Sequence, residues 1–286
     1  MTAPLSQTDL DKLLKGIEIP PCPAILGQLS ALIDSPTASM TAIAALVGRD
    51  VALSAAVIKV ANSPWFALRQ KVATVAQAVG VLGMTAVANL VTGELLRQSL
   101  SEGKTVRMDR FWDSTAKIAA VAARLSRQLT GLSADQAYTF GLFRDCGIPV
   151  LMRRFPDYRE TLQRANASLE QNFTDIEEAR HATNHAVIGY LLTRNWGLPD
   201  TLCRAVQSHH DPQVFSSTAD NDTAKLRSLI VIGILADYLV SSFQHLKEDV
   251  QWLRWRDTIL AHLNLSDSDL FDLQEEIHQD LDANLI

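Results

Sequence analysis

The residues best suited to chemistry in this sequence are histidines and aspartates, and every histidine lies late in the chain. The seven histidines all follow residue 180: His181, His185, His209, His210, His245, His262 and His278. Neutral imidazoles and carboxylates bind divalent ions, and a bound ion can activate water for hydrolysis. Any metal or catalytic site that needs histidine must therefore draw it from the second half.

Two histidine pairs have spacings that bear on metal binding. His181 and His185 are four residues apart in "HATNH", so on one helix they would share a face. The glutamate of an HExxH zinc motif is absent, which favours one exposed and one partly buried histidine over a metal site. His209 and His210 are adjacent, and the following Asp211–Pro212 predicts that their helix has ended. This second cluster is either a polar helix end or part of a functional site.

Two aspartates lie in strongly apolar surroundings. Asp145 occurs in "GLFRDCGIPVL" and Asp237 in "VIGILADYLV". Because a buried carboxylate is costly without a partner, the pair predicts a polar constellation inside a helical core. A metal site and a salt-bridged structural network both fit, and the residues alone favour the network. We expect Arg144 to pair with Asp145, Asp237 or both.

Composition limits the classes of function. The 286 residues are 47% hydrophobic and 20% charged, which predicts a packed core. A net charge of −6 argues against general nucleic-acid binding. The three dispersed cysteines predict free thiols, and the N-terminus lacks the pattern of a signal peptide. The longest apolar run is too short to span a bilayer, so we expect a cytoplasmic protein without membrane partners.

Hydrophobic spacing and helix start and stop signals predict an all-α protein. We expect an N-terminal helical bundle over 17–105 packed on a second bundle over 106–285, with the boundary in "SEGKTVRMD", 101–109. Two helices are expected within 74–100. The other predicted helices lie near 24–33, 40–48, 51–61, 110–129, 134–153, 157–170, 175–195, 199–208, 223–242, 249–263 and 267–282.

Several segments together resemble the HDOD family, the HD-related output domain of bacterial signalling proteins. In the first half, "IPPCPAILGQLSALI", "IAALVGRDVALSAAVIKVANSPWF" and "TVAQAVGVLGMTAVANLV" are similar to the family's opening, its Asn-Ser motif and a following helix. In the second half, "FWDSTAKIA", "GLFRDCGIPVL", "NHAVIGYLLTRNWGLPDTLCRAVQSHH" and "LIVIGILADYLV" match in order and spacing. The resemblance covers about 17–240 as one continuous unit, followed by C-terminal helices. Val51 departs from it, because the family often has proline there.

This resemblance implies a fold like that of HD-domain phosphohydrolases, with a degenerate metal site. Those enzymes bind metal through an early histidine, an adjacent His-Asp pair and a late aspartate. The corresponding positions here are Ser114, Arg144–Asp145 and Asp237, so two of the four ligands are missing. A guanidinium offers no lone pair to a metal and stays cationic. In the related HD-GYP branch, histidines near the positions of His185 and His209–His210 serve as further ligands.

The leading expectation is a non-enzymatic signal-transduction module that acts through protein–protein interaction with signalling proteins in trans. No cofactor, catalytic residue or metal is expected. Residual metal candidates are Asp145, His185, His209, His210 and Asp237. The expected vestigial pocket, able to take a small anionic ligand, consists of Ser114, Arg144, Asp145, His185, His210 and Asp237.

Two alternatives belong to other classes of function. One is a metal-dependent phosphohydrolase or phosphodiesterase with an atypical ligand set. The other is a sensor that binds an anionic nucleotide messenger through Arg144, since arginine suits phosphate recognition. The family often occurs fused to receiver, GGDEF or EAL domains, for which this chain has no room, so we expect it to act in trans or alone.

Overall fold

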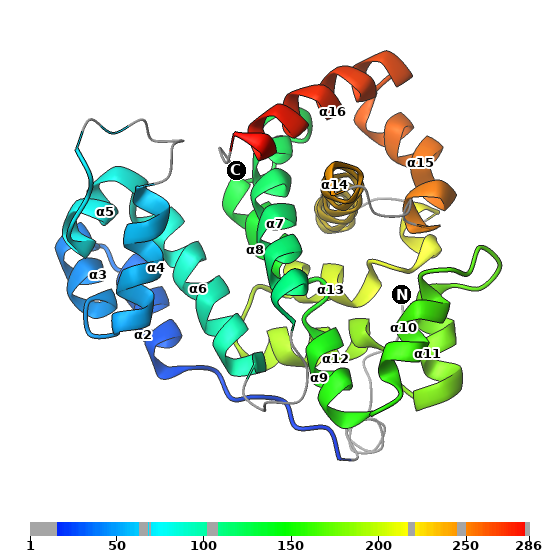
Figure 1. Cartoon of the computed structure of the whole chain (residues 1–286), viewed down its shortest axis with the longest axis horizontal. Helices are drawn as coiled ribbons and strands as arrows, with labels where there is room; N and C mark the ends of the chain where they lie inside the picture. Colours follow the sequence, from blue (N-terminus) through cyan, green and yellow to red (C-terminus); the bar gives the residue numbers. More distant parts are fainter. Residues whose placement is uncertain are drawn as a thin grey trace.

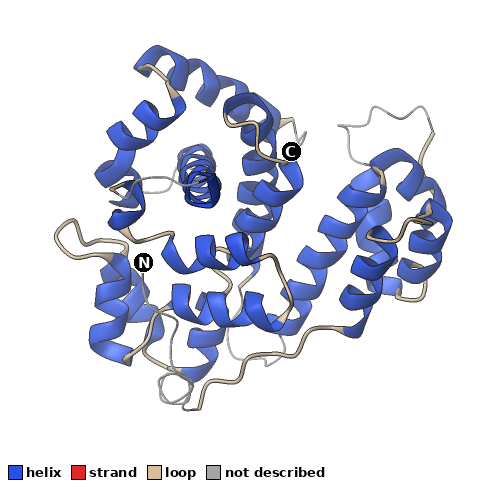
Figure 2. Ribbon diagram, turned by 180° about the vertical axis from the view of Figure 1, so that it is seen from behind, coloured by secondary structure: helices blue, strands red, loops and turns tan. Residues whose placement is uncertain are grey.

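The computed structural model describes residues 16–62, 68, 70–101, 108–216, 221–244 and 250–283. Within these ranges every regular element is a helix and no strand occurs, which confirms the predicted all-α class (Figures 1 and 2). The expectations for the N-terminus to residue 15, the end of the Asn-Ser motif, His245 and most of the 101–109 boundary lie outside the described residues. The division at that boundary therefore stays a prediction.

An N-terminal lobe is formed by α2 (Ala24–Ile33), α3 (Met40–Val47), α4 (Val51–Ala61), α5 (Val75–Leu82) and α6 (Met84–Ser101). The predicted cap at Asp50 is confirmed, because its carboxylate accepts from the amides of Ala52 and Leu53 at 2.8 and 3.0 Å. The side chain of Asn62 bonds both the amide and the carbonyl of Val72, at 2.7 and 2.8 Å. These two bonds hold Val72, just before α5, against the end of α4.

The rest of the chain folds as a larger helical body around a central helix, α14 (Figure 1). Its elements are α7 (Asp109–Leu129), α8 (Ala134–Phe143), α9 (Gly147–Arg154), α10 (Tyr158–Ala165), α11 (Phe173–His181), α12 (His185–Asn195), α13 (Asp200–Ser208), the 3-10 helix η2 (Pro212–Phe215), α14 (Asn221–Phe243), α15 (Val250–Leu263) and α16 (Asp267–Asp282). Helix α14 contacts α7, α8, α13, α15 and α16, and α6 joins the lobe to this body through α8 and α9.

Helix α14 is apolar along most of its length. The stretch Asp222–Phe243 is long and apolar enough to cross a bilayer by length and composition, which corrects the expectation that the longest apolar run is too short. Most of it is buried inside the protein, where the surrounding helices cover it. Its apolar composition suits a helix that other helices contact along most of its length.

Two predicted helices are each divided in two, which corrects the sequence-based boundaries. The helix expected over 134–153 breaks at 144–146, and the helix expected over 175–195 breaks at 182–184. At the second break Ala182 has a left-handed backbone, with φ of 55°, and the Asn184 side chain caps α12 by accepting from the amide of Val187 at 2.8 Å. Both breaks lie at the candidate site.

Candidate functional site

The turn between α8 and α9 carries Arg144 and Asp145, which the sequence placed inside one helix. Gly147, the first residue of α9, makes this turn possible. A Cβ on Gly147 would lie 2.0 Å from the carbonyl oxygen of His185, so only glycine allows the two chain segments to come so close. The contact sets the start of α9 against the start of α12. Asp145 therefore faces His185, with Oδ1 3.5 Å from Nε2.

The Arg144 side chain is 7% exposed and ties this turn to the central helix. Its Nε donates to Asp145 Oδ2 at 2.8 Å, its Nη1 donates to the carbonyl of Gly233 at 3.1 Å, and its Nη2 pairs with Asp237. The expectation that Arg144 pairs with one or both aspartates is confirmed for both. We call Arg144, Asp237 and Asp145 Oδ2 the arginine side of the site.

Asp145 is shared between this arginine and the histidines. Burial alone would raise the pKa of its carboxyl, but the Arg144 guanidinium and His209 hold that pKa well below its usual range. Asp145 is therefore ionised, and its second oxygen, Oδ1, lies 3.4 Å from Nε2 of His209. Asp237 completes its own bonding by accepting from the Ser241 hydroxyl at 3.2 Å.

His185 is fully buried at the first position of α12 and is oriented by Glu177 of α11. Its Nδ1 lies 2.7 Å from Glu177 Oε2, and Glu177 is itself fully buried. The hydroxyl of Tyr158 donates to the other carboxylate oxygen of Glu177. Because an ionised carboxylate can only accept, Nδ1 of His185 is protonated and its Nε2 points into the site. Burial lowers and Glu177 raises the pKa of His185, with a net rise.

His209 and His210 follow α13, whose end at Ser208 confirms the break predicted from Asp211–Pro212. His209 places Nδ1 2.7 Å from the carbonyl of Val206, an acceptor left over at the helix end. The His210 ring stacks on Phe173, with centroids 4.9 Å apart and 13° between planes. Burial lowers the pKa of both imidazoles, so both are neutral near pH 7.

The three imidazoles and Asp145 Oδ1 converge on one point, and we call these four groups the histidine side. Nε2 of His185 lies 3.2 Å from Nε2 of His209 and 3.1 Å from Nε2 of His210. Ligand atoms of all four residues lie within 4.8 Å of one another. Four such donors around one point could hold a divalent metal ion. Asp237, the fifth residual candidate, belongs to the arginine side instead.

Two other sequence candidates lie apart from this convergence. The hydroxyl of Ser114 donates to Gln244 at 3.1 Å, and Gln244 is seven residues, or about 10 Å of helix, beyond Asp237. His181 ends α11 and pairs with the Thr161 hydroxyl at 2.8 Å, so it does not share a helix face with His185. The expected split into one exposed and one partly buried histidine is wrong, because His181 is partly buried and His185 fully buried.

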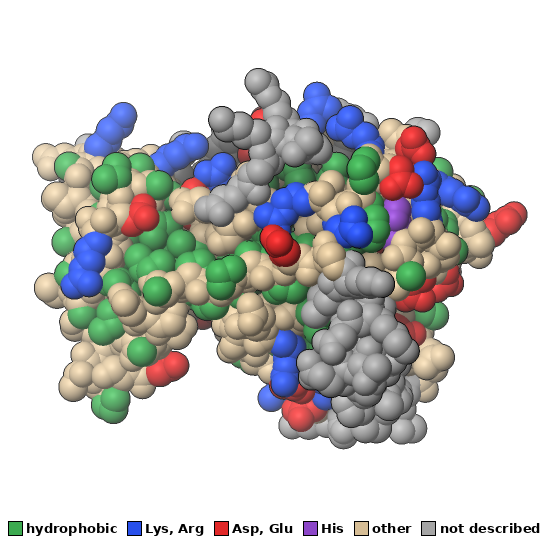
Figure 3. Space-filling view, turned by 90° about the horizontal axis from the view of Figure 1, so that it is seen from below, with side chains coloured by type: hydrophobic (Ala, Val, Ile, Leu, Met, Phe, Trp, Pro, Cys, Tyr) green, Lys and Arg blue, Asp and Glu red, His purple; other side chains and the backbone are tan. Residues whose placement is uncertain are grey.

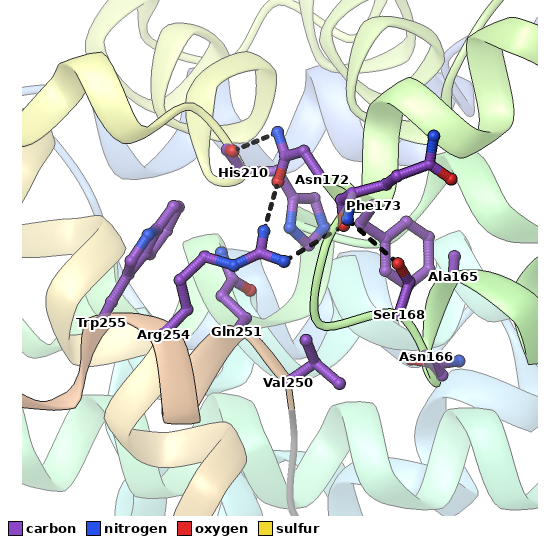
Figure 4. Close-up of a pocket in the computed structure, with 11 residues that line it drawn as sticks. Ala165, Asn166, Ser168, Asn172, Phe173, His210, Val250, Gln251, Arg254 and Trp255 are labelled. Carbon is purple, nitrogen blue, oxygen red and sulfur yellow. Dashed lines mark hydrogen bonds between the residues drawn. The ribbon is translucent and has the colours of Figure 1, made fainter.

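A small hollow opens beside the histidine side, between the start of α11 and the start of α15 (Figure 4). His210, Phe173 and Gln251 line its inner part, while Asn172 and Arg254 lie across it. Arg254 donates to the carbonyls of Leu169 and Gln171 at 2.9 and 3.1 Å, which fixes the loop before α11. His210 is thus the member of the histidine side that lies at this hollow.

Comparison with known proteins agrees with the fold. The family profile described as HDOD domain matches residues 19–212. An uncharacterised protein of Treponema pallidum is 27% identical over 219 residues, which is 72% of this chain, and the chain spans 41% of that relative's length.

Two crystal structures cover 96% of the chain. One is a protein of Shewanella amazonensis SB2B with the provisional name phosphohydrolase, at a TM-score of 0.72, 21% identity and 95% of its own length. The other is an HDOD domain protein of unknown function from Geobacter sulfurreducens, at a TM-score of 0.69, 20% identity and 96% of its own length. The likeness to these structures shows a shared fold. With the family profile matched over more than half of its residues, the chain belongs to the HDOD family.

Proposed function

We propose that this chain is a non-enzymatic signal-transduction module that acts by binding other proteins. The observation that carries the proposal is the position of Arg144, whose guanidinium bridges Asp145 and Asp237. In the HD hydrolases that the chain resembles, the corresponding aspartates hold a metal ion. Here a fixed side-chain cation stands between them, and it would repel an ion at that position.

The surface of the N-terminal lobe is consistent with protein binding. Met40 and Val51, the first residues of α3 and α4, are 49% and 85% exposed. Figure 3 shows hydrophobic side chains gathered over the lobe, on the left of the view, whereas charged side chains are more frequent over the body. Exposed apolar surface of this kind is typical of interaction sites.

The test combines hydrolysis assays with metal analysis of the purified protein. Cyclic dinucleotides, nucleotides and simple phosphoesters are each incubated with the protein and with magnesium, manganese, iron or zinc. We expect no turnover above the rate of buffer with the same metal. Metal-dependent turnover that is proportional to protein and is abolished in Asp237→Ala would overturn the proposal.

The four converging donors of the histidine side favour a second candidate, a metal-dependent phosphohydrolase with an atypical ligand set. It makes the opposite prediction in the same assays. A nucleotide sensor that uses Arg144 has less support, because Nε, Nη1 and Nη2 of that side chain already have acceptors within the protein. Saturable binding of a cyclic dinucleotide, lost in Arg144→Ala, would revive it.

A further inference from the structure

We propose that His185, His209, His210 and Asp145 bind one divalent first-row transition-metal ion, with zinc the best fit, as a closed and non-catalytic centre. The proposal replaces the sequence-based expectation of a pocket without metal. The assignment of the ligands is independent of whether the protein hydrolyses anything, and it rests on four observations about the histidine side.

Four of the six distances between the donor atoms are close to those of a tetrahedral site. Ligand atoms bound at 2.0–2.1 Å around a tetrahedral zinc ion lie about 3.3–3.4 Å from one another. Here Nε2 of His185 lies 3.1 Å from Nε2 of His210 and 3.2 Å from Nε2 of His209. Oδ1 of Asp145 lies 3.4 Å from Nε2 of His209 and 3.5 Å from Nε2 of His185. The other two separations, from His210 to His209 and to Asp145, are within 4.8 Å, so a small movement of His210 would complete the coordination.

The positions of the ring protons leave too few hydrogen-bond donors at the point where the four ligand atoms converge. His185 and His209 each use Nδ1–H toward an acceptor, Glu177 and the Val206 carbonyl. When both rings are neutral, their Nε2 atoms carry lone pairs that face each other at 3.2 Å, beside Oδ1 of Asp145. A proton added to His185 could satisfy one facing atom, whereas a metal ion would accept a lone pair from all four groups.

The groups behind the ligands have the form of an outer coordination shell. Metal-bound histidines usually donate their other ring N–H to a carboxylate or a backbone carbonyl, which fixes the tautomer and the ring orientation. Glu177 does this for His185 and Val206 does it for His209. Tyr158 in turn holds Glu177, so the second shell is itself fixed.

The balance of charge also favours a divalent ion. Asp145, Glu177 and Asp237 contribute three carboxylates, and Arg144 contributes one guanidinium. The formal charges of these four side chains sum to −2, and a proton on His185 would offset only one of the two negative charges. A divalent cation would neutralise both, and buried charges are tolerated when they are paired or bound to metal.

The donor set selects the class of metal and argues for a closed site. Imidazole suits zinc, iron, nickel and copper, whereas magnesium and calcium prefer carboxylate, carbonyl and water oxygens. Catalytic zinc sites usually have three protein ligands and one open position, while structural sites have four. Four protein ligands are present here, which agrees with a non-enzymatic module. Of the three histidines, His210 is the most exposed, at 7%, and it lines the hollow described above.

The experiment uses the full chain, treated with chelator and then titrated with zinc or with cobalt(II) as a spectroscopic probe. We expect one equivalent bound, intense visible absorption bands of tetrahedral cobalt(II), and a rise in the thermal unfolding midpoint with metal. Absence of binding by the wild-type protein would overturn the proposal without reference to any variant.

Substitutions of the proposed ligands test whether the bound ion lies at the histidine side. The double variant His209→Ala/His210→Ala should lose the cobalt bands and the metal-dependent rise in unfolding midpoint, while the matched control His262→Ala, which alters a histidine paired with Ser228 elsewhere, should keep both. Glu177→Gln should weaken zinc binding about 10–100-fold and retain a tetrahedral spectrum. Equal stoichiometry and spectra in the wild type and the double variant would refute the site.

The results also separate this inference from the proposed function. Bound metal without hydrolysis supports both. Failure to bind metal removes the centre and leaves the non-enzymatic function standing. Bound metal with turnover removes both the non-enzymatic function and the closed, non-catalytic character of the centre, and leaves only the assignment of its ligands.

Discussion

The arginine side and the histidine side share one carboxylate but obtain their positive charge from different sources. Asp145 gives Oδ2 to Arg144 and turns Oδ1 toward His185 and His209. On the arginine side the cation belongs to the chain and is fixed by covalent structure. On the histidine side burial lowers the pKa of His209 and His210, and the cation that we propose there is a metal ion from solution. The comparison separates a permanent structural bridge from a site whose state depends on what it binds.

Removal of the Arg144 guanidinium should have the largest effect on the free energy of unfolding. Arg144→Met leaves Asp145 and Asp237 without their shared partner, and loss of one member of a buried ion pair costs about 3–5 kcal/mol. We expect a value near 3 kcal/mol in urea unfolding, because both carboxylates keep some contact with water. Arg194→Met, which alters an exposed pair with Asp200, is the control and should cost less than about 1 kcal/mol. Equal costs for the two variants would contradict the bridge.

A methyl group at Gly147, where the start of α9 contacts the start of α12, should have the next largest effect on the free energy of unfolding. Gly147→Ala places a carbon atom against the backbone of His185, and such overpacking costs about 3 kcal/mol. Because this contact positions Asp145 toward the histidines, both the zinc affinity and the free energy of unfolding should decrease. Gly80→Ala in α5 has no neighbour within 4 Å and should leave both quantities unchanged or slightly improved. If Gly147→Ala behaves like Gly80→Ala in calorimetric titration and unfolding, the close contact is unimportant.

A smaller change acts on the histidine side alone. Tyr158→Phe removes the hydroxyl that donates to buried Glu177, and an unsatisfied buried acceptor costs about 1–3 kcal/mol. Zinc affinity should also decrease, since Glu177 orients His185. Tyr238→Phe, which removes a partly buried bond to Gln274, is the matched control. It should cost about 1 kcal/mol or less and leave zinc affinity unchanged. A loss of zinc affinity in Tyr238→Phe as well would indicate a general effect of stability.

The smallest expected effect concerns hydrolysis. Arg144→His restores the residue type of an HD pair, but we expect no phosphohydrolase turnover from it. Ser114 offers no imidazole, and its hydroxyl contacts Gln244 two helical turns beyond Asp237. The same assays applied to Arg144→His/Ser114→His should also show none. Turnover in Arg144→His would mean that the arginine alone separates this chain from an enzyme, and turnover only in the double variant would mean that both positions do.

Sequence patterns predicted most helices because these are amphipathic or apolar segments between clear start and stop signals. The helices at 24–33 and 267–282 have the predicted bounds, and Asp50 caps α4 as expected. The missed breaks lie where helical periodicity continues across a turn. Nothing in the identity of Ala182 indicates a left-handed backbone, although Asn184 two residues later is a frequent helix cap and could have signalled the new start.

The site could be predicted in its residue types but not in its arrangement. Asp145, His185, His209 and His210 were all candidates, yet their convergence depends on the close contact at Gly147, which no local pattern reveals. Glu177 was missed because it stands beside Glu178 in "DIEEAR", and only the tertiary structure distinguishes the fully buried glutamate from its neighbour. The pairing of Arg144 could be foreseen, since two apolar-flanked aspartates require a cation.

The central position of α14 has a consequence for how much of the chain forms an independent folding unit. The HDOD profile ends at residue 212, but Gly233 and Asp237, which hold Arg144, lie on α14 beyond that limit. A fragment of residues 19–212 would expose the walls of the space that α14 fills and would leave Arg144 without two of its acceptors. Limited proteolysis should accordingly yield no long-lived fragment that ends near residue 212, and domain boundaries for recombinant expression are better drawn beyond α14.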